Sequence, residues 1–118
     1  MQVVTELSVE KSARKAVNAG VEQLKKRLMS VEGQNIQLLP NSDYLIHERY
    51  YVKNEFFFVY KLKAQDCQTR LLLWLDQKHQ TVVLIAYLIK KKTKMKYYQD
   101  FGHYAETFYH THICGLPD

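Results

Sequence analysis

The sequence predicts an α+β fold in one domain spanning residues 1–118, and three observations lead to this prediction. A segment with apolar residues at helical spacing comes first, four consecutive strand-like segments follow, and a second helical segment comes last. Short polar connections between successive strands favour an antiparallel meander. We therefore expect an N-terminal helix or helical hairpin packed on a four-stranded, largely antiparallel sheet, with a C-terminal helix.

The first helical segment is preceded by a short strand-like stretch at residues 1–5 and begins near Ser8, a residue type common at helix N-caps. Apolar residues then recur at the spacing of one helix face: Val9, Ala13, Ala16, Val17, Val21, Leu24 and Leu28. Gly20 interrupts this pattern, so the segment is either one helix with a weak point or a helical hairpin.

The strand-like segments cover residues 44–53, 55–63, 70–76 and 81–91, and the last helix covers residues 97–110. The N-terminal helix must cover one face of the sheet. The other face, or its rim, is then expected to present Arg49, Arg70 and a block of lysines. Tyr87 is expected on the same strand face as Val83 and Ile89. Two roles are therefore open for Tyr87: packing in the core or contact with a ligand.

The charge of the chain is basic and unevenly distributed. Lys and Arg number 17 against 12 Asp and Glu, which gives a net charge of +5. Five lysines fall within seven residues at the end of the last predicted strand and just beyond it: Lys90, Lys91, Lys92, Lys94 and Lys96. Such clustering favours a polyanionic or acidic partner. The alternative is a solvated strand end that suppresses edge-to-edge aggregation.

The remaining composition predicts a cytoplasmic protein. Cys67 and Cys114 are too few for a disulfide scaffold, and we expect both to be reduced. We expect neither a signal peptide nor a membrane span, because no apolar run approaches the ~18 residues that a span needs.

The run from Arg70 to Lys94 resembles the RelE/ParE superfamily of toxins from bacterial toxin–antitoxin systems. Members of this superfamily typically have an Arg that begins a strand, an aromatic and an acidic residue near its end, a polar turn, an apolar strand and then lysines. Here these features correspond to Arg70, Trp74, Asp76, residues 82–89 and residues 90–94. Residues 46–49 are similar to the preceding strand of the family, whereas the aromatic stretch at residues 50–69 is longer than the family's usual hairpin.

The resemblance implies an endoribonuclease that cuts mRNA on the ribosome without a metal or other cofactor, and a cognate acidic antitoxin that covers the basic surface. Cleavage by the 2′-OH needs a proton acceptor, a cation for the phosphate and a donor to the leaving oxygen. Arg70 and one of Lys90, Lys91 or Lys92 are expected to act as cation and base. Tyr109 and His110 match the acid–base pair of some family members. Arg49, Tyr87, Lys94 and Lys96 are the expected RNA contacts.

Other functions stay open at this point. A non-catalytic nucleic-acid-binding or inhibitor module of mobile-element origin would use the same basic surface, and a ParE-type protein would poison DNA gyrase. His103, Glu106 and His110 share one face of the last helix at a spacing that suits zinc, as a metal-dependent hydrolase would need. Neither a cysteine pair nor a second motif supports that site, so no metal is expected.

Overall fold

The computed structural model describes residues 2–5, 7–30, 36–43, 45–63, 68–90 and 97–115, without the side chains at positions 30, 36–38, 63, 90 and 97–99. The main elements are β1 (Gln2–Thr5), α1 (Arg14–Ser30), β2 (Glu48–Val52), β3 (Glu55–Lys63), β4 (Gln68–Asp76), β5 (Thr81–Lys90) and α2 (Tyr97–Phe108). Short 3-10 turns at Lys11–Ala13 and Ile36–Asn41 precede α1 and β2, and a π-helical turn at Tyr109–Ile113 continues α2. The α+β class is confirmed.

The sheet has five strands and is mixed, which corrects the prediction of a four-stranded sheet. Its order is β1-β5-β4-β3-β2. Strands β2 to β5 form the expected antiparallel meander. The additional strand is β1, which runs parallel to β5 and places Val3 beside Val82. The sequence does not reveal this pairing because β1 is only four residues long and its partner is the last strand of the chain.

Helix α1 runs without a break through Gly20, so the helical-hairpin alternative is wrong. Its apolar face packs on one side of the sheet, where Leu24 and Leu28 are buried together with Leu71 and Leu73 of β4. A Cβ atom on Gly20 would lie 3.1 Å from Cδ1 of Leu71. The glycine that suggested a helix break therefore allows α1 to approach β4 closely.

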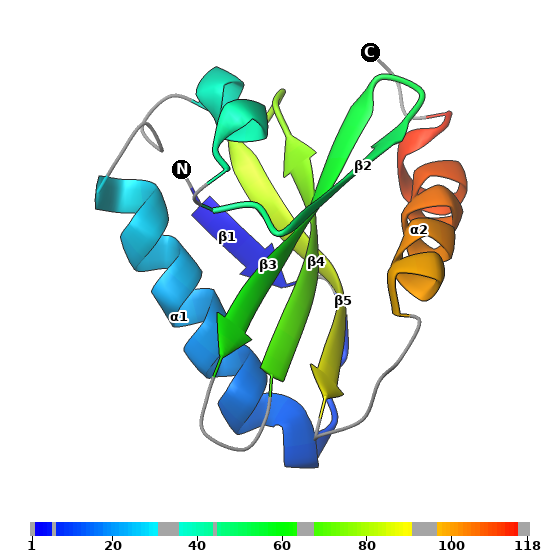
Figure 1. The fold of residues 1–118 in the computed structure, drawn as a ribbon. Coiled ribbons are helices and arrows are strands. Elements are labelled where there is room, and N and C mark those ends of the chain that lie inside the picture. The colour runs from blue at the N-terminus through cyan, green and yellow to red at the C-terminus, as the bar shows by residue number, and fades with distance from the viewer. Residues whose placement is uncertain are drawn as a thin grey trace.

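Helix α2 covers part of the opposite face, so helices lie on both sides of the sheet (Figure 1). Phe101 and Ala105 of α2 are buried against a second apolar cluster that includes Phe57, Leu72 and Ala86. This arrangement differs from the expectation that the second face is mainly a basic surface. In the described part of the chain, no helix has the length and hydropathy needed to cross a membrane.

A β-bulge in β5 changes which residues share a face. Leu72 pairs with Ala86 and Leu73 pairs with Leu84, so Ile85 has no partner on β4. An extra residue in one strand reverses the alternation of side chains beyond it. Tyr87 therefore packs in the cluster on the α1 side together with Val82 and Leu84.

Candidate functional site

Arg70 lies on the face of the sheet that α2 partly covers, opposite Lys61 of β3 and Leu88 of β5. It is 3% exposed, although it was expected on an open basic rim. Its Nη2 atom donates a hydrogen bond of 2.6 Å to Oε1 of Gln68, two residues earlier on the same strand. A guanidinium held in this way cannot grip a ligand from solvent, but its charge still acts on neighbouring groups.

Lys61 and His47 are the neighbouring groups that matter most. Lys61 is half-buried and pairs directly with Arg70 across the β3–β4 ladder. His47 lies just before β2, and its backbone N–H donates to the carbonyl oxygen of Val59 at 2.8 Å. The hydrogen bond places His47 beside the part of β3 that carries Lys61.

The electrostatic setting of His47 favours the neutral imidazole. Partial burial lowers the pKa of His47 below its ordinary value of 6.5, and the charges of Arg70 and Lys61 lower it further. Glu48 acts in the opposite direction but does not reverse the shift. At neutral pH, His47 is therefore an uncharged proton acceptor beside two cations. We call His47, Lys61 and Arg70 the cationic cluster.

The lysine block begins at the last residue of β5, and most of it is outside the described residues. Lys90 pairs with Gln68 at the end of β5, two positions beyond the Leu88–Arg70 pair. Lys91, Lys92, Lys94 and Lys96 all fall within residues 91–96, for which the structure gives no placement.

Tyr87, an expected RNA contact, lies on the opposite face of the sheet from Arg70, and its contact with RNA stays a prediction. The bulge puts Tyr87 on the α1 side of the sheet, whereas Arg70 lies on the α2 side. The hydroxyl of Tyr87 accepts a hydrogen bond from the backbone N–H of Glu10 at 3.2 Å. Tyr87 thus ties β5 to the segment that leads into α1.

Arg49 also lies apart from the cationic cluster. Its Nη2 atom forms an ion pair of 2.8 Å with Asp43, and its Nε atom donates to the carbonyl oxygen of Pro40 at 3.0 Å. These contacts hold the connection between α1 and β2 against the sheet. Arg49 is therefore not a member of the cationic cluster, and its predicted contact with RNA would lie outside that cluster.

Tyr109 and His110 lie at the other end of the sheet from Arg70. Tyr109 lines a cavity with Asp76 and His79, at the turn between β4 and β5. Asp76 is six residues beyond Arg70 on β4, which corresponds to roughly 20 Å at ~3.3 Å per residue. Arg70 and the Tyr109–His110 pair cannot serve one phosphodiester together. Among the described residues, no group of three or more His, Cys, Asp or Glu is placed to hold a metal ion.

Sequence reasoning did not identify His47 and Lys61 as site residues. His47 was visible only as part of the strand at residues 46–49, and Lys61 stood at the end of an aromatic strand. Their relation depends on strand register, which places Lys61 opposite Arg70. The sequence offered one indication of this pair: Lys61 lies near the end of one predicted strand, and Arg70 begins the next.

Comparisons of this chain with protein-family models, with curated proteins and with solved structures gave no match.

Proposed function

We propose that this protein is a metal-independent endoribonuclease of the toxin type that cuts mRNA on the ribosome. The observation that carries this proposal is the cross-strand pair of cations, Lys61 and Arg70, beside His47 at one end of the sheet. The resemblance to RelE/ParE toxins at residues 70–94 points to the same chemistry, and the lysine block begins at Lys90, which pairs with Gln68 of β4.

Each member of the cluster has a chemical task in this proposal. His47 accepts the proton of the 2′-OH, which attacks the adjacent phosphorus. The bond to the 5′-oxygen of the next nucleotide breaks, leaving a cyclic 2′,3′-phosphate and a 5′-OH. The ammonium group of Lys61 stabilises the charge on the non-bridging oxygens. A lysine of the block that follows β5 donates the proton to the leaving oxygen.

Arg70 acts through His47 in this scheme and does not touch the substrate. Its burial keeps it from the RNA backbone, and its charge lowers the pKa of the imidazole. Arg70 is therefore a positioning residue, which affects the reaction only by lowering the pKa of His47. This changes the expected role of Arg70, which the resemblance suggested as a direct phosphate ligand.

The experiment is cleavage of mRNA on programmed ribosomes, mapped by primer extension in the presence of EDTA. Discrete new 3′ ends are expected that disappear with His47→Ala and become much weaker with Lys61→Gln, while Lys15→Gln on the exposed face of α1 cuts like the wild type. Cleavage that needs added metal would contradict the proposal. Relaxation defects in a gyrase assay without RNA cleavage would favour the gyrase poison.

The net charge of +5 and the five lysines at positions 90–96 favour one second candidate, a nucleic-acid-binding module without catalysis. Such a module needs positive charge but no proton acceptor. It would bind RNA with an affinity that falls as salt rises, and His47→Ala would bind as the wild type does. The same set of variants therefore separates the two functions.

A further inference from the structure

A cavity of about 770 Å³ lies at the opposite end of the sheet from the cationic cluster. The β2–β3 turn, the β4–β5 turn and the π-helical turn after α2 contribute its walls. This volume falls within the range of small-molecule sites, which is about 300–1,000 Å³. The cavity is therefore large enough for one nucleotide.

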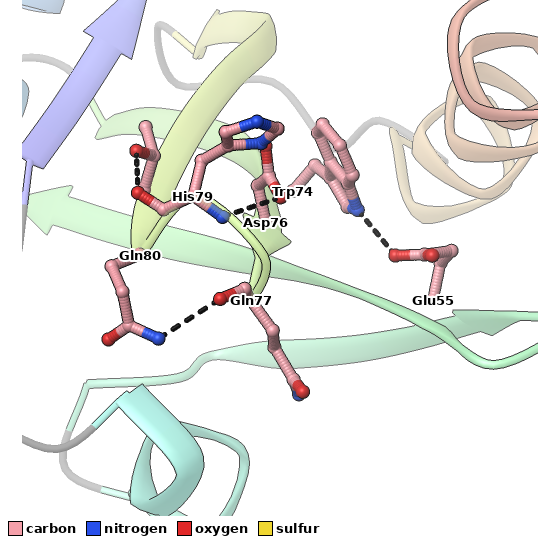
Figure 2. Close-up of polar contacts among 7 residues, drawn as sticks. Glu55, Trp74, Asp76, Gln77, His79 and Gln80 are labelled. Atoms are coloured by element: carbon pink, nitrogen blue, oxygen red, sulfur yellow. Dashed lines mark hydrogen bonds and ion pairs between the residues drawn. The ribbon is translucent and has the colours of Figure 1, made fainter. Parts of the chain in front are cut away.

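Aromatic rings form one side of the cavity. The indole N–H of Trp74 donates to Oε2 of Glu55 at 2.8 Å, which fixes the plane of the ring (Figure 2). Phe108 packs against the same indole at an angle of 53°, with the ring centroids 5.5 Å apart. Tyr109 also lines the cavity. Fixed aromatic faces of this kind are what an unpaired nucleobase stacks on.

The charges around the cavity leave positive groups available to a ligand. Glu55 is engaged by Trp74, and Asp76 accepts the backbone N–H of His79 at 3.3 Å and contacts its Nδ1 atom at 2.7 Å. Lys53 and Lys78, one from each hairpin turn, line the same cavity. Neither ammonium group has a hydrogen bond or ion pair with any described residue, so both can meet an anion.

The three backbone turns around the cavity differ in conformation. Lys53 and Gln80, one in each hairpin turn, have positive φ angles of 55° and 52°. The third side is the π-helical turn, which closes with a hydrogen bond of 2.7 Å from Cys114 N–H to the Tyr109 carbonyl. Positive φ angles are usual in tight hairpin turns, whereas a π-helical turn is rare and often lies at a functional site.

We infer that this cavity binds one nucleotide of single-stranded RNA, with the base against Trp74 and the phosphate between Lys53 and Lys78. This inference rests on the proposed function for its choice of RNA as the source of the nucleotide. Along β4, Trp74 lies four residues and Asp76 six residues from Arg70, which corresponds to roughly 13 Å and 20 Å at ~3.3 Å per residue. The bound nucleotide is therefore separated from the cleaved bond and sets affinity rather than rate.

Trp74 is the only tryptophan in the chain, so its fluorescence reports directly on this cavity. Titration with nucleoside 5′-monophosphates is expected to change that fluorescence saturably, and inorganic phosphate alone is expected to bind far more weakly. Lys53→Asn and Lys78→Gln should each weaken nucleotide binding about tenfold, as loss of one charge-assisted hydrogen bond does. Asn tolerates the positive φ at position 53, and Lys15→Gln is the matched control.

The outcomes separate this inference from the proposed function. Saturable nucleotide binding that depends on Lys53 and Lys78, in a protein that cuts no RNA, would support the cavity and refute the endoribonuclease. Cleavage without any saturable change in Trp74 fluorescence at millimolar nucleotide would overturn the inference alone. In the active protein, Lys78→Gln should raise KM about tenfold at unchanged kcat. A fall in kcat with unchanged KM would also overturn it.

Discussion

Lys61 and Arg70 lie directly opposite each other on β3 and β4, so two cations occupy neighbouring positions on one face of the sheet. Like charges at such positions destabilise a sheet unless another feature offsets them. Here Gln68 holds the guanidinium, and both charges act on His47. The pair thus has a chemical consequence, because it helps to keep the imidazole neutral.

The pH dependence of cleavage tests this consequence. Because the pKa of His47 lies below 6.5, cleavage should rise with pH and reach half of its plateau below pH 6.5. Lys61→Gln should move this rise to higher pH, and Arg70→Gln should move it further, since Arg70 has the larger effect. The pH profile of each variant is measured from the cleavage activity that the variant retains. An unchanged profile in both would show that neither charge acts on the proton acceptor.

The stability of the fold should depend on His47 in the same pH range. Well above pH 6.5, His47 is neutral in both the folded and the unfolded chain and contributes nothing to the pH dependence. As the pH falls below 6.5, the unfolded chain takes up a proton that the folded chain does not, so the free energy of unfolding decreases. Urea unfolding one unit above and one unit below pH 6.5 should show a smaller decrease for His47→Gln. A larger decrease in that variant would mean that the pKa is raised.

Tyr87 should matter for stability and not for RNA cleavage. Tyr87→Phe removes the acceptor for the backbone N–H of Glu10 and should lower the free energy of unfolding by about 1 kcal/mol. Chemical denaturation gives the stability, and primer extension gives the cleavage. A hundredfold loss of cleavage at normal stability would restore Tyr87 to the active site and contradict its placement on the α1 side.

Gly20 should tolerate little added volume. Gly20→Leu would force a side chain against Leu71 and should destabilise the protein by about 1–3 kcal/mol. Ala19→Leu, at the exposed neighbouring position, is the matched control and should leave the free energy of unfolding nearly unchanged. Equal stability of the two variants would argue against close packing of α1 on β4.

The α+β class and the meander from β2 to β5 were predictable because their signals are local. Apolar spacing identified α1, and short polar turns identified the hairpins. The partner of β1 and the bulge at Ile85 were not predictable, because each depends on how distant strands align. Because of that bulge, Tyr87 lies on the face opposite to the one that simple alternation along the strand predicts.

The candidate site was predictable only at Arg70. Its burial and its pairing with Lys61 follow from register, and the role of His47 follows from both. The distance between Arg70 and Tyr109 along the sheet was equally hidden, because the sequence does not show which end of the sheet the last helix reaches. The sequence shows which residue types could take part in catalysis, but only the fold shows which of these residues lie together.

The most direct test compares His47→Ala with His103→Ala, which replaces an exposed histidine on α2. Both proteins would be incubated with programmed ribosomes, and the mRNA ends would be mapped by primer extension in EDTA. Cleavage that is lost in His47→Ala and kept in His103→Ala is the expected result. Full cleavage by His47→Ala would contradict the assignment of the cationic cluster as the catalytic centre.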